Sequence, residues 1–449
     1  MYQLMSSALA AIGFFIASTA PPPAKAQTPP IRAYQPKATE SARKAQIQEQ
    51  QQKADPSRFD LKKYPVIESN ASHWQNSLWA IGVLAPEKKY AVQALENILQ
   101  MTTTANLTDP QKGIIDTAMQ VGVELYTLKP AIYGKLQPYF LRTINSSNDS
   151  QWVALSLSAL AKSPKPQIEK LNLTVQQRFP KWAQDIHLRN AIQGDRQLKV
   201  SAIPNLADLL KWQVAPQQAH MYVFCRPNRD ILCLAVLKDR NGKFLKQGKQ
   251  LWSASLLLQS LRNLDWYFSN GRTPQGLYRM EGVSLQPDDE VFHAYGQFSL
   301  VNLFIPFEDG VKAFLPNKKG KFTGNLPAYQ ALLPPTWRNY VPIQQTFWAG
   351  NVGRSLFRIH GSGAAINFFQ NKAAVVNAKN FNWNATLGCL SALEIYDNRG
   401  SLLKADMPKI LEALNNVGKG KVDGYLIVVD IPSPTDAPIT VAEIAKHLK

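Results

Sequence analysis

Apolar positions in the first half of the chain recur with the spacing of amphipathic helices. The apolar segment at 79–85 is echoed at 118–125 and again at 152–161, in steps of roughly 35 to 40 residues. A repeat of that length is typical of paired antiparallel helices that stack along the chain. We therefore predict an all-α, solenoid-like helical domain over residues 63–205, with an ordinary helical bundle as the alternative.

In the second half, the pattern changes to short apolar segments separated by turn residues. Residues 222–225 and 231–236 predict the two strands of a hairpin, and Asn241-Gly242 predicts a further tight turn. An apolar segment close to the C-terminus has the pattern of a buried strand between two short helices. These features predict a mostly β domain with a few helices over residues 206–449, so the whole chain is expected to be a multidomain α and β protein.

Two further segments precede the helical pattern. Residues 1–26 contain an apolar run of roughly ten residues that ends near Ala24-Lys25-Ala26, which indicates a cleaved signal peptide and is too short to span a bilayer. An uncleaved anchor is the alternative, because no Lys or Arg precedes the run. We expect a periplasmic or extracellular protein with no stable membrane span after signal removal. Residues 27–62 are rich in Gln and Lys and predict a disordered linker.

Composition narrows the classes of partner. The chain has 449 residues, of which 45% are hydrophobic and 18% charged, and this balance indicates a folded protein with more than one domain. A formal net charge of +18 favours carboxylate-rich or polyanionic partners. The basic residues are scattered and follow no nucleic-acid-binding motif, so in an exported protein we expect no nucleic-acid partner. Because the Cys and His residues lack zinc-site spacing, we expect no metal and no cofactor.

The chain has three cysteines, an odd number. If the first predicted hairpin is centred on Arg229, Cys225 and Cys233 lie directly opposite each other, and an exported protein could join them in a disulfide. The alternative is that all three cysteines are small buried hydrophobic residues. In the first case Cys389 remains as a free thiol.

The surroundings of Cys389 suggest a nucleophile. Gly388 precedes the thiol, so a bend there could direct backbone N–H groups to one point beside the sulfur, where they would stabilise an oxyanion. A thiol also needs a base, since only a few per cent of an ordinary Cys is ionised at neutral pH. His360 follows a strand-like segment and precedes Gly361-Ser362-Gly363, and it is the natural candidate.

These elements resemble the motifs of a known family. The Thr-Leu-Gly-Cys at 386–389 resembles the [Ser/Thr]-x-Gly-Cys nucleophile motif of the YkuD-type L,D-transpeptidases. The Ile-His-Gly-Ser at 359–362 is similar to their His-Gly-Thr/Ser element, and the Thr-Pro-Gln-Gly at 273–276 to their Thr-Pro-x-Gly element. The three elements occur in the family's order, and the resemblance covers roughly residues 220–431.

The resemblance implies a site and a reaction. Cys389 would be the nucleophile and His360 the base, with the carbonyl of Gly361 orienting the imidazole, and the N–H groups of Leu387 and Gly388 would contribute, with that of Cys389, to an oxyanion hole. The partner would be a peptidoglycan stem peptide, which acylates Cys389 with release of a terminal D-alanine. The acyl group would then be transferred from Cys389 to an amine. Residues expected to bind the substrate are Ser362, Thr386, Ser391 and Arg358.

The sequence also departs from the family pattern. Leu387 stands where the family usually has a second histidine, and Ser391 where it usually has Arg or Asn. His360 and Cys389 are 29 residues apart, which requires an insertion at about 368–383. Three alternatives therefore stay open. They are an L,D-carboxypeptidase that uses water as the acceptor, a catalytically degenerate wall-binding or scaffold protein whose helical domain binds a protein partner, and a cysteine peptidase of another fold.

Overall fold

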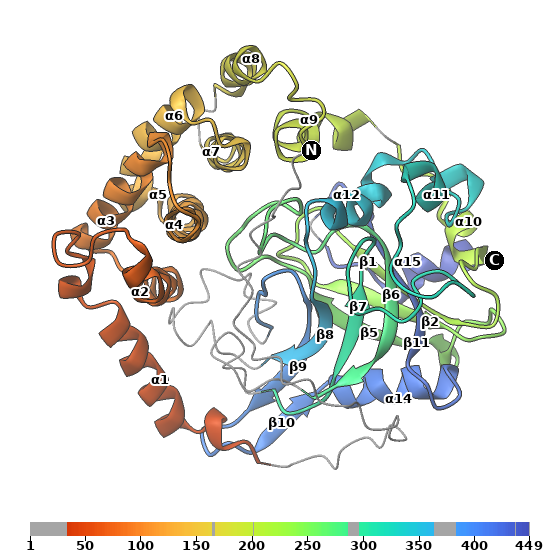
Figure 1. Cartoon of the computed structure of the whole chain (residues 1–449). Helices are drawn as coiled ribbons and strands as arrows, with labels where there is room; N and C mark the ends of the chain where they lie inside the picture. Colours follow the sequence, from red (N-terminus) through yellow and green to blue (C-terminus); the bar gives the residue numbers. More distant parts are fainter. Residues whose placement is uncertain are drawn as a thin grey trace.

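The protein consists of a helical N-terminal region and a C-terminal part built on a large mixed β-sheet (Figure 1). The predicted signal peptide and most of the insertion between the His360 and Cys389 motifs lie outside the described residues. The computed structural model describes residues 34–163, 167–200, 202–285, 296–362, 383–435 and 437–448.

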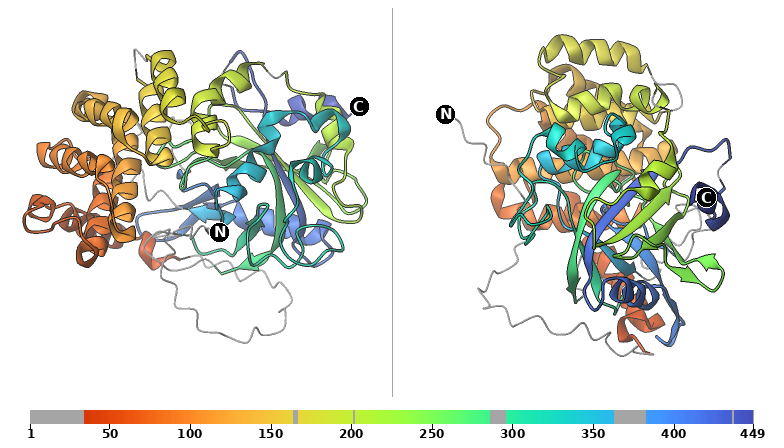
Figure 2. Two further views of the ribbon diagram at one scale, coloured as in Figure 1. Left: turned by 45° about the horizontal axis from the view of Figure 1, so that its top comes forward. Right: turned by 90° about the vertical axis from the view of Figure 1, so that its right-hand side faces the viewer.

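The helices of the N-terminal region are α1 (Glu40–Lys53), α2 (Ala71–Leu84), α3 (Lys89–Leu99), α4 (Asp109–Leu128), α5 (Pro130–Tyr133), α6 (Gln137–Ser146), α7 (Ser150–Ala161), α8 (Ile168–Arg178) and α9 (Ile186–Val200). They form an arc along one side of the C-terminal part (Figures 1 and 2). Helices α2, α4, α7 and α9 pack one against the next in the layer nearer the sheet, and α3, α6 and α8 follow one another in the outer layer.

Capping residues in the sequence mark where two of these helices begin. Helix α4 begins with a capping box in which the Thr108 hydroxyl accepts from the Gln111 backbone and the Gln111 side chain accepts from the Thr108 backbone. Helix α7 is capped by Asp149, whose carboxylate accepts from the N–H of Trp152 at 3.0 Å. The Trp152 indole in turn donates to Asp116 of α4 at 2.5 Å, which ties the two helices together.

The prediction of a disordered linker is partly wrong. The sequence predicts disorder over residues 27–62, but the described part of this segment contains helix α1. Thr39 caps the helix, which is rich in Gln, Lys and Ala and therefore has favourable helix propensity although it has little to bury. Arg43 of α1 also donates to Asn398 at 2.7 Å, so the segment is held against the C-terminal part by polar contacts that hydrophobic content does not reveal.

The large sheet has nine strands in the described residues, in the order β10-β9-β5-β2-β1-β11-β6-β7-β8. Strand β8 also pairs with β9, so all strands except β10 form a closed ring. The pairs β1–β11 and β8–β9 are parallel, and the other pairs are antiparallel. The strands are β1 (Ala219–Cys225), β2 (Cys233–Lys238), β5 (Ser253–Leu257), β6 (Gly276–Ser284), β7 (Leu300–Phe304), β8 (Phe357–Ser362), β9 (Leu390–Tyr396), β10 (Leu402–Ala405) and β11 (Asp423–Asp430), and a separate pair is β3 (Lys246–Gln247) with β4 (Gln250–Leu251).

Among the residues that the structure describes, five α-helices accompany the sheet, as expected for a mostly β part with a few helices. Helix α14 lies along the sheet beside β2 and β9, and α10 and α15 lie near the C-terminus of the chain (Figure 1). The helices are α10 (Leu206–Lys211), α11 (Leu326–Gln330), α12 (Gln345–Asn351), α14 (Met407–Val417) and α15 (Val441–Ala445).

The first predicted hairpin is confirmed, with its predicted register. Strands β1 and β2 pair Phe224 with Leu234, a register centred on Arg229. One step further towards the turn, Cys225 and Cys233 form a disulfide. Cys389 is the free cysteine of the chain, and it is buried.

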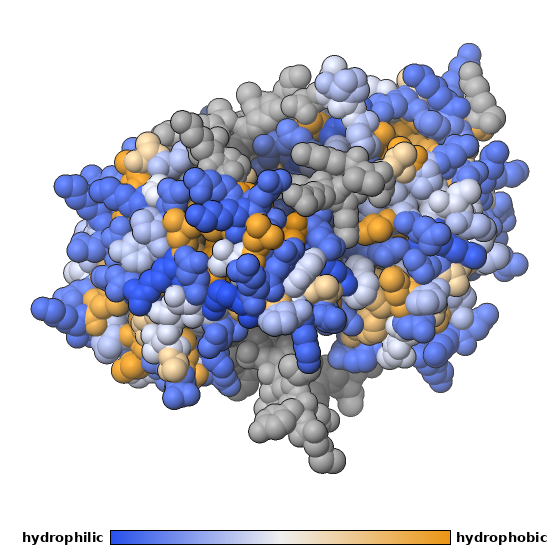
Figure 3. Space-filling model, turned by 90° about the horizontal axis from the view of Figure 1, so that it is seen from above, coloured by the Kyte–Doolittle hydropathy of each residue, from blue (hydrophilic) through white to orange (hydrophobic). Residues whose placement is uncertain are grey.

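The helical region and the sheet share one hydrophobic core. A continuous cluster of buried side chains extends from Leu125 and Leu155 in the helices to Phe268 and Leu390 in the C-terminal part. A second cluster lies on the other side of the sheet and includes Leu209 of α10. The face in Figure 3 is mostly hydrophilic, with hydrophobic groups in small separate areas. Among the described helices, none has both the length and the hydrophobicity that a bilayer span requires.

Candidate functional site

The two principal motif residues lie on neighbouring elements. Cys389 ends a turn that leads directly into β9, and His360 is within β8, which pairs with β9 in parallel. The register aligns His360 with Ser391, two residues beyond Cys389. The pairing therefore places His360 opposite a position two residues after Cys389, although His360 and Cys389 are 29 positions apart in the sequence.

The Cys389 thiol is enclosed and protonated at neutral pH. Its residue is 8% exposed, and Sγ donates to the carbonyl oxygen of Leu356 at 3.6 Å. Burial raises the pKa of Cys389 to about 11, and the nearby positive charge of Arg358 only partly opposes this. The resting thiol is consequently a poor nucleophile until a base removes its proton.

The His360 imidazole is neutral at the same pH. Burial lowers the pKa of His360 to about 4, although Nδ1 lies 3.3 Å from the carbonyl oxygen of Gly361. In the tautomer that donates from Nδ1 to this carbonyl, the other ring nitrogen carries the lone pair that a general base needs. The contact with Gly361 is the one that the family resemblance implies.

Two threonines shape the turn at 386–389. The Thr386 hydroxyl donates to the carbonyl of Cys389 at 2.7 Å and accepts from the N–H of Gly388 at 3.3 Å. The Thr273 hydroxyl donates to the carbonyl of Gly388 at 2.9 Å. Thr386 was expected to bind substrate, but its buried hydroxyl is used within the turn. The Gly388 N–H, an expected oxyanion donor, is likewise already bonded to Thr386.

The buried side chain of Arg354 lies against the turn at 386–389. Arg354 donates from Nη2 to the carbonyl of Gly271 at 2.7 Å and from Nη1 to the carbonyls of Arg272, at 2.9 Å, and Trp266. Its guanidinium also lies 4.8 Å from the centre of the Phe357 ring. Burial lowers the pKa of Arg354 to about 10, so it remains charged at neutral pH. Arg354 is thus a structural residue of the site, and both of its terminal nitrogens donate to backbone carbonyls.

The other residues that the sequence predicts at the site differ in how exposed they are. Ser391 is fully buried, so its side chain is not accessible to a substrate in this conformation. Arg358 is partly exposed and favours the thiolate of Cys389 electrostatically, which is compatible with a role at the site. Leu387 is also partly exposed. Ser362 pairs through its backbone with Leu393, and its side chain lies outside the described residues.

Glu308 fixes Leu356, whose carbonyl oxygen accepts the hydrogen bond of the Cys389 thiol. Its carboxylate accepts from the N–H of Leu356 at 2.7 Å and from the N–H of Ile305 at 3.0 Å. Leu356 has a positive φ of 64°, and its carbonyl oxygen is the acceptor for Cys389 Sγ. Burial raises the pKa of Glu308 to about 7. No sequence pattern indicates this arrangement, because its three parts come from three separate loops.

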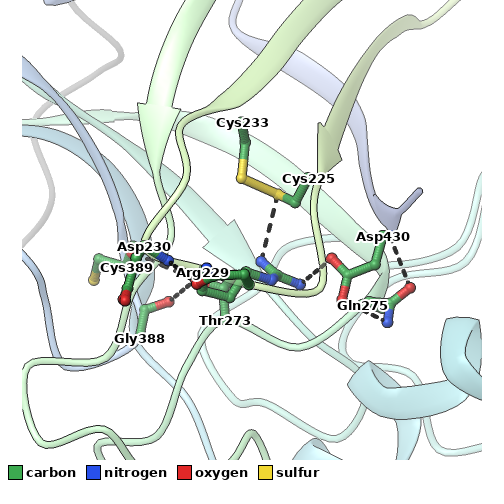
Figure 4. The surroundings of a disulfide bond; sticks show 10 residues. Cys225, Arg229, Asp230, Cys233, Thr273, Gln275, Gly388, Cys389 and Asp430 are labelled. Atoms are coloured by element: carbon green, nitrogen blue, oxygen red, sulfur yellow. Dashed lines mark hydrogen bonds and ion pairs between the residues drawn. A yellow bond between two sulfur atoms is a disulfide. The ribbon is translucent and has the colours of Figure 1, made fainter. Parts of the chain in front are cut away.

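The Thr-Pro-Gln-Gly element connects the turn to the disulfide hairpin. Gln275 exchanges hydrogen bonds with Asp430, its amide donating to the carboxylate and its carbonyl accepting from the Asp430 N–H, both at 2.9 Å. Arg229 forms an ion pair with Asp430 at 2.7 Å and contacts Cys225 Sγ at 3.4 Å. Figure 4 shows this succession from the disulfide through Arg229 to Asp430 and Gln275.

Within the described ranges, no group of three or more His, Cys, Asp or Glu residues could hold a metal ion. Comparison of the chain with models of known protein families gives no match, and comparisons with curated proteins and with solved structures give no significant match. The functional argument therefore depends on the geometry of the site and on the motifs.

Proposed function

We propose that the protein is a peptidoglycan L,D-transpeptidase that transfers stem peptides through a thioester on Cys389. One observation carries the proposal: the Cys389 turn and His360 come from neighbouring parallel strands, with the His360 Nδ1 atom 3.3 Å from the Gly361 carbonyl oxygen. These contacts support the roles of nucleophile, base and orienting carbonyl that the motifs imply for Cys389, His360 and Gly361.

The proposed reaction starts from a neutral Cys389 thiol and a neutral His360 imidazole. As the Cys389 sulfur attacks the carbonyl carbon of the third stem residue, His360 takes the thiol proton and the contact of Sγ with Leu356 is lost. A C–S bond forms, the C–N bond to the terminal D-alanine breaks, and His360 returns the proton to the leaving amine. An acceptor amine then attacks the thioester, and the Cys389 thiol is regenerated.

The finer features of the fold support the same proposal. The succession of inner and outer helices from α2 to α9 is what a solenoid-like arrangement requires. The closed mixed sheet carries all three motif elements on or beside β6, β8 and β9 and is compatible with an L,D-transpeptidase-like domain. The disulfide is of the kind that persists in an oxidising compartment and supports a periplasmic or extracellular location.

A catalytically degenerate wall-binding or scaffold protein is the second candidate. The observations that favour it are the low exposure of Cys389, the raised pKa of its thiol, and the hydrogen bond that already occupies the Gly388 N–H. An L,D-carboxypeptidase would use the same Cys389 thioester with water in place of the amine.

The deciding experiment uses a carbapenem, a β-lactam that acylates the thiol of this family. We expect the intact mass of the protein to increase by one carbapenem, and Cys389→Ala to show no increase while retaining the wild-type circular dichroism spectrum. If Cys389 is demonstrably reduced and no mass is added, the transpeptidase proposal fails. Retained binding of isolated cell walls by both proteins would then support the scaffold candidate.

A further inference from the structure

The loop between β5 and β6, residues 258–275, is packed between the helical region and the Cys389 turn. It is not a surface loop, since Leu264 and Phe268 belong to the shared hydrophobic core and Arg262 is buried. Its outer side contacts the helices of the arc, and its inner side contacts the turn at 386–389.

On the outer side, the loop makes polar and cation–π contacts with three helices, α2, α4 and α7. Glu124 of α4 forms an ion pair with Arg262 at 2.8 Å, and the two side chains are only 3% and 4% exposed. The Arg262 guanidinium also lies 4.9 Å from the centre of the Trp79 ring of α2. Further hydrogen bonds join the loop to the arc, from Asn270 to Gln120 of α4 at 2.8 Å and from Ser158 of α7 to Asp265 at 2.6 Å.

On the inner side, the loop backbone is bonded directly to the first residue of the turn. The Leu261 N–H donates to the Thr386 carbonyl at 2.7 Å, and the Thr386 N–H donates to the Gln259 carbonyl at 3.1 Å. Arg262, the residue bound by Glu124, directly follows Leu261 in the chain. A displacement of Arg262 would therefore be transmitted within one residue to Thr386, whose hydroxyl holds the carbonyl of Cys389.

We propose that the helical region positions the Cys389 turn through this loop, and that Glu124 and Arg262 are the positioning pair. The proposal rests on the proposed function only in treating Cys389 as the reactive residue. A buried ion pair suits this role because it fixes one geometry, and the loss of either partner leaves the other charge buried and uncompensated. The helical region then acts on the site indirectly, through the loop that bonds to Thr386.

The test uses the full-length protein and the rate at which iodoacetamide alkylates Cys389, measured by intact mass. Glu124→Gln keeps the shape of the side chain and removes its charge. Labelling should be done well above pH 7, because burial raises the pKa of Glu124 to about 7 and the wild-type carboxylate must be ionised. We expect E124Q to label about tenfold faster than the wild type, because the released turn exposes the thiol.

A matched control separates positioning from general loss of stability. Glu443→Gln breaks the ion pair between Glu443 and Arg226, which holds α15 and does not involve the loop. Both variants are labelled in increasing, non-denaturing urea. Local release of the turn makes labelling of E124Q nearly independent of urea, whereas labelling through global unfolding rises steeply with it. We expect E443Q to show only the steep component.

Two results would overturn the proposal. Labelling of E124Q within about twofold of the wild-type rate would show that the pair does not position the turn. Faster labelling with the same steep urea dependence as E443Q would show that Glu124 contributes only to global stability. Neither result depends on carbapenem acylation, so failure of the positioning role and failure of the transpeptidase proposal are distinguishable.

Discussion

Replacement of Gly388 by alanine tests the packing beneath the proposed nucleophile. Gly388 has a φ of +121°, a conformation that residues with a side chain rarely adopt. A methyl group built there would overlap with Arg354 Nη2 and would lie 3.0 Å from the Gly271 carbonyl oxygen and 3.2 Å from Cε1 of Phe357. Arg354 cannot simply move away, because its guanidinium is bonded to three backbone carbonyls.

The expected cost follows from these two effects. An unfavourable backbone conformation costs about 1 to 3 kcal/mol, and overpacking in a rigid site costs a further 1 to 3 kcal/mol or so. Reduced flexibility of the unfolded chain offsets about 0.4 to 1 kcal/mol of this. We therefore expect Gly388→Ala to lower the free energy of unfolding by about 3 kcal/mol, and to reduce carbapenem acylation because the turn cannot keep its shape.

Urea denaturation followed by circular dichroism measures the change, with two glycine controls. Gly320 has a φ of +84° and no heavy atom of the described chain within 4 Å of an added methyl group, so Gly320→Ala should cost only the backbone strain, about 1 kcal/mol. Gly134 has similar free space and a helical φ, so Gly134→Ala should be neutral or slightly stabilising. If Gly388→Ala and Gly320→Ala agree within about 0.5 kcal/mol, the argument from the Arg354 contact is refuted.

Two further predictions concern pH. Because burial raises the pKa of Cys389 to about 11, its alkylation rate should still rise by about tenfold per unit between about pH 8 and pH 10, and a plateau below pH 9 would contradict the enclosed thiol. Glu394 is fully buried beside Gly361, and burial raises its pKa from 4.5 to about 7. Burial favours the neutral carboxyl, so its contribution to stability is complete below pH 4.5 and is lost as the pH rises through 7. Glu394→Gln should remove up to about 3 kcal/mol of this dependence, which urea titrations at pH 5 and pH 8 would measure, and parallel wild-type and variant profiles would refute it.

Features that depend on local spacing could be predicted from the sequence. The hairpin register centred on Arg229 follows from alternation and turn length, and it brings Cys225 and Cys233 together. The Asp149 cap is likewise a signal carried by adjacent residues. Low hydrophobicity predicts disorder for the segment that contains helix α1, but the position of this helix depends on contacts with residues more than 300 positions away.

The interior of the site could not be predicted in the same way. Arg354 could have been a surface residue that binds substrate carboxylates, and only the folded chain shows it enclosed by the carbonyls of the β5–β6 loop. The role of the Thr386 hydroxyl could not be predicted either, since a motif gives the residue type but not the direction of its hydrogen bond. Burial of Ser391 and Cys389 depends on how β8 and β9 pair, which is a long-range property of the sheet.

The arc of helices contacts the C-terminal part at both of its ends, through Arg43 of α1 with Asn398 and through Arg189 of α9 with Trp348 of α12. The contact of Arg43 with Asn398 joins residues 355 positions apart, so it cannot form until most of the chain has left the ribosome or crossed a membrane. Helices α2 to α9 pack mainly with their sequence neighbours and can form earlier. Helix α1 therefore emerges before α2 to α9 but docks after them, which leaves it open to proteases and chaperones during synthesis.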